Sequence, residues 1–370
     1  MRSFLRPQVL VLLTLLFPGV GVLACDGGLT GPDLEIEPIG RVERGLEIEL
    51  RVSRDGIVVP TDDVDYSADP AASVQFVGNG RALLVEAGQV TITARAGGRS
   101  TRLDLDVATP PTIVFDRRVD GNRDIYRAAL DGRDVVRLTT STGDDLQPTA
   151  AGGVIVFVSF RDGNAELYRV PLAGGADERL TVTPANETDP ALSRDGARLA
   201  YTSDVTGTPR LWLAGPDATR AIWATEGLGF GGSIEASPGW SPTGDRVVFV
   251  GTHEGSADLF TLRVSDLTFE RLTIETTAEV EPSWSPDGQS IVFASNRDGP
   301  TNLYVANGQI SRLTTSPDTH GQPAWLPDGR IVFTTFVDGV PRLSWLDPAE
   351  PERIHQVPGG DGGANPAAAP

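Results

Sequence analysis

Residues 282–299 read PSWSPDGQSIVFASNRDG, and this stretch decides the fold. The tetrapeptide SPDG at 285–288 stands just before an apolar run at 291–293. A type I β-turn prefers Pro at its second position and Gly at its fourth, so this tetrapeptide predicts a tight turn. The tripeptide RDG at 297–299 follows the apolar run and indicates a β-hairpin. The stretch therefore predicts short antiparallel strands joined by tight turns.

The same pattern recurs six times between residue 112 and the C-terminus. The aromatic residue after the apolar pair returns every 40 to 48 residues, at Phe115, Phe157, Tyr201, Phe249, Phe293 and Phe333. A Leu-Thr pair recurs in four copies, at Leu138, Leu180, Leu272 and Leu313. A period of roughly 40 residues with four short strands is typical of a β-propeller blade. The chain is therefore predicted to be all-β, with a six-bladed propeller over residues 112–370.

The PxWSPDG, IVFxSxRDG and RLT segments of these copies resemble the TolB-type propeller repeat. The resemblance covers about 255 residues. The third copy departs from it, because it is longer and carries a Gly-rich insertion at 227–232. TolB itself works with Pal and the Tol complex in envelope integrity. The resemblance therefore implies a propeller that binds partners in the bacterial cell envelope.

The first copy lacks a PxWSPDG segment before Ile113, and the C-terminus offers a substitute. Residues 323–327 read PAWLP, and the last five residues, 366–370, read PAAAP, about one repeat further on. We therefore predict that the C-terminal segment supplies the innermost strand of the first blade. This pairing closes the propeller and removes an open sheet edge.

A separate module is predicted at residues 34–108. Apolar and polar residues alternate at 46–52, 90–94 and 103–107, which indicates half-buried strands of a small β-sandwich. The line from Val64 to Gly98 resembles the bacterial Ig-like domain of group 2, with Tyr66 at the aromatic position of that family. The resemblance implies a spacer or an adhesive module. An Ig-like module replaces the α/β domain that TolB carries, which puts a true TolB role in doubt.

The first 24 residues are predicted to be a lipoprotein signal peptide. Arg2 and Arg6 precede an apolar run at 9–17, and small residues lead to Cys25, the sole cysteine. This order resembles the lipobox of bacterial lipoproteins, in which the cysteine is lipidated. Residues 25–33 are then a short tether. We expect a protein that a lipid alone holds at the membrane, facing the periplasm or the cell surface.

The composition excludes some functions. Against 50 acidic residues stand 31 basic ones, a formal net charge of −19, so we expect no nucleic-acid binding. A single cysteine allows no intramolecular disulfide. Neither a G-x-S-x-G elbow nor an H-E-x-x-H motif occurs, and the sequence identifies no catalytic residue. A monomer is expected.

Candidate ligand-binding residues stand just before a recurring proline, at which the chain is expected to enter the innermost strand. Three places before that proline are Asp145, Glu187, Glu235, Glu279, His320 and Gly363. One place before it are Gln147, Asp189, Ser237, Glu281, Gln322 and Asn365. Residues two apart on a strand share a face, so both sets are predicted to point into the channel. The predicted site at the channel mouth comprises Asp145, Glu187, Asp189, Glu235, Glu279, Glu281 and His320.

Carboxylates gathered in this way repel one another unless a cation or a basic partner neutralises them. The predicted ligand is therefore an envelope protein, a basic peptide, or a small cationic or polyol molecule. Oxygen ligands would suit Ca²⁺ or Mg²⁺ as an ion in the channel. A channel whose polar lining is only solvated is the alternative.

The sequence therefore predicts a lipid-anchored binding or scaffold protein without catalysis. Two other functions stay open. One is a propeller enzyme that acts on polysaccharide as a lyase or hydrolase through the channel carboxylates. The other is an adhesin that uses the Ig-like module.

Overall fold

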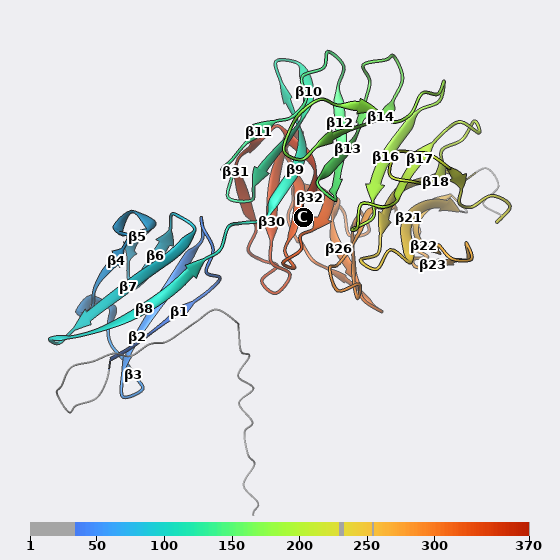
Figure 1. The fold of residues 1–370 in the computed structure, drawn as a ribbon. Helices are drawn as coiled ribbons and strands as arrows, with labels where there is room; N and C mark the ends of the chain where they lie inside the picture. The colour runs from blue at the N-terminus through green and yellow to red at the C-terminus, as the bar shows by residue number, and fades with distance from the viewer. Residues whose placement is uncertain (1–33, 229–232, 254, 370) are drawn as a thin grey trace, which may run out of the picture. The chain divides into compact units, whose positions relative to one another are not determined.

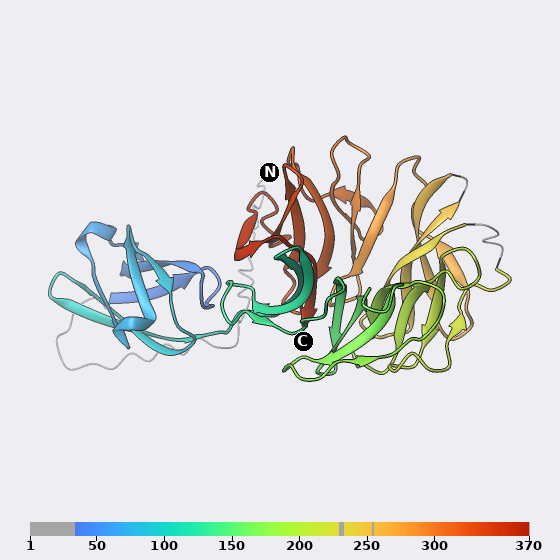
Figure 2. The same ribbon diagram turned by 90° about the horizontal axis from the view of Figure 1, so that it is seen from above.

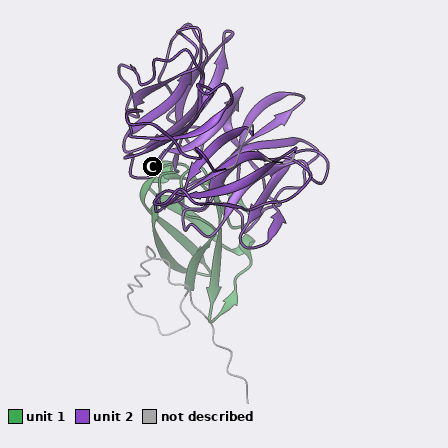
Figure 3. Cartoon of the chain, turned by 90° about the vertical axis from the view of Figure 1, so that its right-hand side faces the viewer, with its two compact units in different colours: residues 1–110 green, residues 111–370 purple. Residues whose placement is uncertain are grey.

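The computed structural model describes residues 34–228, 233–253 and 255–369. The predicted signal peptide, Cys25 and the tether lie outside the described residues. The chain divides into two compact units, residues 1–110 and residues 111–370 (Figure 3). None of the described segments forms a helix with the length and apolar character that a membrane span requires.

Two antiparallel sheets build the described part of the first unit. One has the order β1-β2-β6-β5, with β3 paired to β2, and the other has the order β4-β7-β8. Their bounds are β1 Leu34–Ile39, β2 Glu47–Arg54, β3 Ile57–Val58, β4 Asp65–Asp69, β5 Val74–Gly78, β6 Arg81–Leu84, β7 Gly88–Ala96 and β8 Arg99–Val107. Two single-turn 3₁₀ helices, η1 Thr61–Asp63 and η2 Ala71–Ser73, lie between strands.

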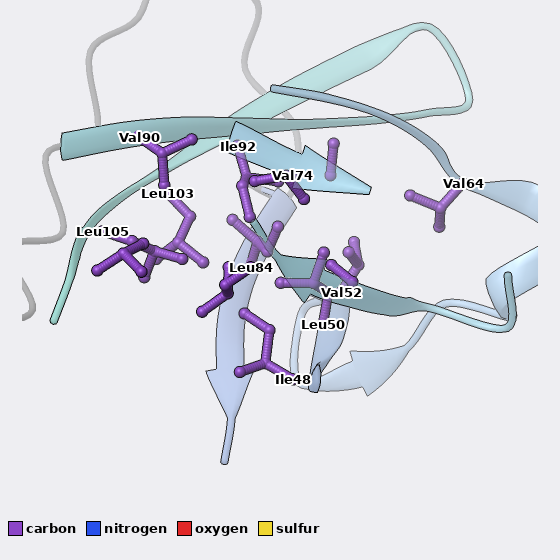
Figure 4. Close-up of a cluster of buried hydrophobic side chains, with 14 of the residues drawn as sticks. Ile48, Leu50, Val52, Val64, Val74, Leu84, Val90, Ile92, Leu103 and Leu105 are labelled. Carbon is purple, nitrogen blue, oxygen red and sulfur yellow. The ribbon is translucent and has the colours of Figure 1, made fainter. Parts of the chain in front are cut away.

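The core of this unit follows from the alternation of apolar and polar residues along its strands. Ile48 and Leu50 of β2 are buried with Ile92 of β7 and Leu103 of β8, so the inner faces of both sheets contribute to one cluster (Figure 4). Successive side chains of a strand point to opposite faces, which leaves the intervening polar residues exposed. The observed architecture is thus a β-sandwich.

Six four-stranded antiparallel sheets, the blades, build the second unit and follow one another in chain order (Figures 1 and 2). Blade 1 contains β32, β9, β10 and β11, and blades 2 to 6 contain β12–β15, β16–β19, β20–β23, β24–β27 and β28–β31. The first three blades comprise β9 Thr112–Val119, β10 Asn122–Ala129, β11 Val136–Arg137, β12 Asp145–Ala151, β13 Val154–Ser159, β14 Glu166–Pro171, β15 Glu178–Arg179, β16 Glu187–Leu192, β17 Leu199–Ser203, β18 Arg210–Ala214 and β19 Ile222–Trp223.

The remaining strands complete the all-β fold that the sequence predicts. They are β20 Glu235–Trp240, β21 Arg246–His253, β22 Ser256–Arg263, β23 Phe269–Arg271, β24 Glu279–Trp284, β25 Ile291–Ser295, β26 Asn302–Ala306, β27 Ile310–Arg312, β28 Thr319–Trp325, β29 Ile331–Val337, β30 Val340–Leu346, β31 His355–Asp361 and β32 Gly363–Ala369. The first strand of each blade is its inner strand, and in blade 1 the inner strand is β32.

The C-terminal strand joins the first and last copies of the repeat. Strand β32 pairs with β9, with Ala364 opposite Asp116 and Ala368 opposite Ile113. It also contacts the inner strands of both neighbouring blades, β12 and β28. This is the pairing that the repeated Pro-Ala-x-x-Pro spacing predicts.

The recurring Leu-Thr pair has a structural reason. Its threonine follows the short outer strand, and the hydroxyl oxygen accepts the backbone N–H of the third strand. Ile125 donates to Thr139 at 3.0 Å and Leu303 donates to Thr314 at 3.0 Å. A buried N–H must find an acceptor, and the outer strand is too short to provide one at this point.

The recurring aromatic residues pack both within and between blades. Phe157 lies beside Tyr168 of the neighbouring strand, with ring centroids 6.0 Å apart. The same two rings belong to a buried cluster with Val114 and Ile125 of blade 1. The repeat of roughly 40 residues therefore encodes the core between blades as well as the strands themselves.

Candidate functional site

Five of the seven predicted site residues are buried rather than exposed at a channel mouth. Asp145, Glu187, Glu235, Glu279 and His320 expose at most 2% of their surface. The prediction that their side chains line an open channel is therefore wrong. Each has polar partners within the blades, so these residues hold the blades together.

Glu235 shows how such a carboxylate is satisfied. Its Oε1 accepts a hydrogen bond from the Arg210 guanidinium at 3.1 Å, and its Oε2 accepts the backbone N–H of Leu211 at 3.0 Å. The Thr225 hydroxyl donates to the same Oε2. Arg210 and Leu211 belong to blade 3 and Glu235 begins the inner strand of blade 4, so this carboxylate joins two blades.

Glu279 and His320 are likewise held by contacts inside the propeller. Arg297 donates to the Glu279 carboxylate at 2.7 Å, and its guanidinium lies over the ring of Tyr304 at 5.0 Å. His320 Nδ1 lies 3.0 Å from the Thr314 hydroxyl, and its ring packs edge-on against Phe333. Burial lowers the pKa of His320 to about 4, so this side chain is neutral at pH 7.

Asp145 and Glu187 are also satisfied by neighbouring side chains. Arg161 and Ser141 each donate to Asp145 at 3.2 Å. The hydroxyl groups of Thr183 and Ser203 donate to Glu187 at 2.9 and 2.8 Å. Both carboxylates therefore serve the packing of the blades.

A β-bulge explains why the two predicted sets separate. Every inner strand shifts register just at its proline. The residue before that proline has a positive φ in all six strands, from 49° at Asn365 to 56° at Glu281. A left-handed residue breaks the regular alternation of a strand. The residue three places before the proline therefore turns into the blade, and the residue one place before it does not.

The bulge residues form what we call the inner ring, which consists of Gln147, Asp189, Ser237, Glu281, Gln322 and Asn365. These six are partly exposed. Because the bulge takes their backbone N–H groups out of the sheet, each needs another acceptor.

Side chains of the neighbouring blade supply several of these acceptors. Asp189 N–H donates to Gln147 Oε1 at 3.2 Å, and Gln147 Nε2 donates back to the Asp189 carboxylate at 2.7 Å. The N–H of Gln322 donates to Glu281 Oε2 at 2.6 Å, and that of Asn365 donates to Gln322 Oε1 at 2.9 Å. The inner ring is thus a chain of contacts from one blade to the next.

Asp116 belongs to the same network, although the sequence did not single it out. Its carboxylate accepts from Asn365 Nδ2 at 2.6 Å and from the N–H of Gln147 at 3.3 Å, and it also pairs with Arg123. The signal was present, because Asp116 directly follows Phe115 where the other copies have no carboxylate.

Three carboxyl groups of this network have raised pKa values. Burial raises the pKa of Asp116, although Arg123 and Asn365 oppose the effect. Burial also raises the pKa of Asp189, against the hydrogen bonds that it accepts. Burial and the charge of Asp189 raise the pKa of Glu281, while the hydrogen bond from the N–H of Gln322 lowers it. Negative charge is therefore costly here, and a bound cationic group would relieve that cost.

Glu281→Gln tests this electrostatic description. Because the pKa of Glu281 is raised on folding, the folded protein binds the proton more tightly than the unfolded chain. The contribution of the Glu281 carboxyl to stability therefore increases as the pH falls through the folded-state pKa toward the ordinary value of about 4.3. Gln keeps an acceptor for Gln322 without the charge. We expect a variant that melts no lower than the wild type at pH 7 in calorimetry, and any advantage over the wild type should shrink as the pH is lowered toward about 4.3. A melting temperature more than about 3 °C lower at pH 7 would contradict this account.

A cavity of about 150 Å³ lies at the opposite ends of the inner strands. It is lined by the residue two places after each recurring proline, which is Ala150, Leu192, Trp240, Trp284, Trp325 and Ala368 in blade order from 2 to 6 and then 1. We call it the tryptophan mouth. In the sequence these tryptophans are simply part of the repeated segment around the proline. Their restriction to three consecutive copies was the signal that could have revealed the cavity.

The described residues offer no cluster of three His, Cys, Asp or Glu side chains that could hold a metal ion. We therefore propose no Ca²⁺ or Mg²⁺ site.

Comparisons with known proteins agree with the fold. Residues 229–344 match the TolB beta propeller domain. The TolB homolog of Chlorobaculum tepidum is 32% identical over 161 residues, which are 44% of this chain and 26% of that protein. The chain thus spans about a quarter of the length of this curated relative.

Two solved structures share the architecture. TolB from Acinetobacter baumannii is 16% identical, with a TM-score of 0.64 and a coverage of 83% of both chains. A chain of the nidogen/laminin complex is 11% identical, with a TM-score of 0.55 and a coverage of 70% of this chain and 98% of that one. The second unit is therefore a TolB-like β-propeller.

Proposed function

We propose that this protein is a lipid-anchored binding protein of the bacterial cell envelope, whose propeller binds a basic segment of a partner protein at the inner ring. The observation that carries this proposal is the ring itself. Asp189 and Glu281 belong to this ring, and the charge of Asp189 adds to burial in raising the pKa of Glu281, in a chain of net charge −19. A lysine or arginine of a partner would favour their ionised forms.

The rest of the chain supports this arrangement. The order of basic, apolar and small residues before Cys25 favours lipidation of that cysteine. The β-sandwich of the first unit fits the Ig-like spacer proposed for residues 34–108, and residues 112–370 would then form the binding unit. A propeller chain of similar fold occurs in the nidogen/laminin complex, so the architecture is compatible with protein binding.

Site-specific crosslinking in producing cells tests the proposal. A photoreactive residue at Ala278 stands directly before β24, next to the inner ring, and the carboxylates stay intact. The matched control is Ser311, an exposed residue of the outer strand β27 in the same blade. We expect one envelope protein to crosslink from position 278, and the yield to fall at least fivefold when Asp189→Asn and Glu281→Gln are added.

Two results would reject the proposed function. One is an identical set of crosslinked proteins from positions 278 and 311. The other is a specific crosslink from position 278 that survives the double substitution undiminished, because the ring carboxylates would then not recognise the partner.

A further inference from the structure

We propose that the tryptophan mouth is a second binding site, which takes one aromatic side chain of a partner polypeptide with an acidic residue next to it in the partner's sequence. This inference goes beyond the proposed function and does not rest on it, because the tryptophan mouth and the inner ring lie toward opposite ends of the inner strands. Three observations carry the proposal: the walls, the size and the charge of the cavity.

Large aromatic side chains line one side of the cavity, and the side chains on the other side are mostly smaller. Trp240, Trp284 and Trp325 come from the consecutive blades 4, 5 and 6, and the facing blades 1 to 3 contribute two alanines, a leucine and an arginine. This cavity has indole rings in one half only. Aromatic rings prefer offset-stacked or edge-to-face contacts with one another, so this half favours an aromatic group.

The tryptophans are held in place before any ligand arrives. Trp240 Nε1 donates to the carbonyl oxygen of Ala191 at 3.0 Å, and the Arg198 guanidinium lies over its ring at 4.6 Å. Trp284 packs against a buried cluster shared by blades 4 and 5, and Trp325 against one shared by blades 5 and 6. A rigid wall loses little conformational entropy on binding, which favours affinity.

The volume selects one ring. A cavity of about 150 Å³ has room for a molecule the size of benzene. A phenyl side chain of a partner therefore fits, whereas a folded surface does not enter. Pro242 and Pro286 contribute further rigid apolar surface at the cavity.

The charge selects the neighbour of that ring. Arg194 is the one charged residue among the described residues that line the cavity, and its side chain is exposed. It stands in blade 3 at the turn position that Pro286 holds in blade 5. In a chain with a net charge of −19, a cavity without carboxylates and with one arginine favours a ligand that carries a carboxylate.

Two short peptides test the inference on the full chain by ¹⁹F NMR titration. The first is acetyl-Asp-(4-fluoro-Phe)-amide, and the second is the same peptide with Asn in place of Asp. We expect the Asp peptide to bind at least fivefold more tightly than the Asn peptide. Arg194→Gln should remove that difference and leave the affinity for the Asn peptide unchanged.

Variants of the walls complete the test. Trp284→Ala should weaken both peptides at least tenfold. Ala368→Phe should also weaken both peptides at least tenfold, because the added ring fills the cavity from the opposite side. It removes no contact, so it tests the inference even if Trp284→Ala folds poorly. Val182→Ala, at an exposed position of blade 2, is the control and should change neither affinity. No binding of either peptide at 10 mM, equal affinity for both, or full affinity in Ala368→Phe would overturn the inference.

Discussion

Removal of residues 363–370 is expected to lower the melting temperature of the propeller by about 10 to 20 °C. Strand β32 lies in register with β9 and contacts β12 and β28, so its loss opens a sheet edge and separates the first blade from the last. Loss of roughly five backbone hydrogen bonds at about 1 kcal/mol each amounts to about 5 kcal/mol. In a unit of this size, each kcal/mol shifts the melting temperature by about 2 to 4 °C.

A complementation experiment shows whether the strand itself is responsible. A synthetic peptide of residues 359–370, added in excess to the shortened protein, should restore most of the lost melting temperature, because a ligand that binds only the folded state raises stability. Scanning calorimetry measures both effects. A shortened protein that melts like the full chain would show that β32 contributes nothing to stability.

Glu235→Ala is expected to destabilise the propeller by about 3 to 5 kcal/mol. The Glu235 side chain is fully buried and accepts from Arg210, the N–H of Leu211 and the hydroxyl of Thr225. Truncation removes the acceptor that these three donors share. It also leaves the Arg210 guanidinium, which is 8% exposed, without the Glu235 carboxylate. Breaking a buried ion pair from one side has a cost of this order. Chemical denaturation measures the change in the free energy of unfolding.

Two further variants make this result specific. Glu235→Gln keeps one acceptor oxygen and should lose about half as much. Glu270→Ala removes an exposed carboxylate of β23 in the same blade and should change the free energy of unfolding by less than about 0.5 kcal/mol. If Glu235→Ala were as mild as Glu270→Ala, the assignment of Glu235 to the packing of blades would fail.

The structure distinguishes acidic residues that the sequence alone places in one class. Glu279 and Glu281 stand two apart and both precede the same proline. Glu279 is fully buried against Arg297, whereas Glu281 belongs to the inner ring and bonds the next blade. Substitution of the first should loosen a blade, and substitution of the second should change the electrostatics of the ring.

The sequence determined the propeller because the information for it is local and repeated. The SPDG and RDG turns, the apolar runs and the Leu-Thr pairs specify strands and hairpins through neighbours a few residues away. Repetition six times then requires that blades pack on one another, since no single blade can bury its faces. The same regularity predicted the role of the C-terminal strand. The first copy lacks the proline-containing inner segment, and a similar segment stands at residues 366–370.

Only the tertiary structure decided which side chains meet. The alternation rule put both sets of carboxylates in the channel, but a left-handed bulge before each proline separates them. The N–H of the bulge residue needs an acceptor from the neighbouring blade, so the conformation of Asp189 depends on Gln147, 42 residues away. The tryptophan mouth has the same origin. Each Trp-containing segment is an ordinary part of its repeat, and a cavity arises only where six inner strands bring their ends together.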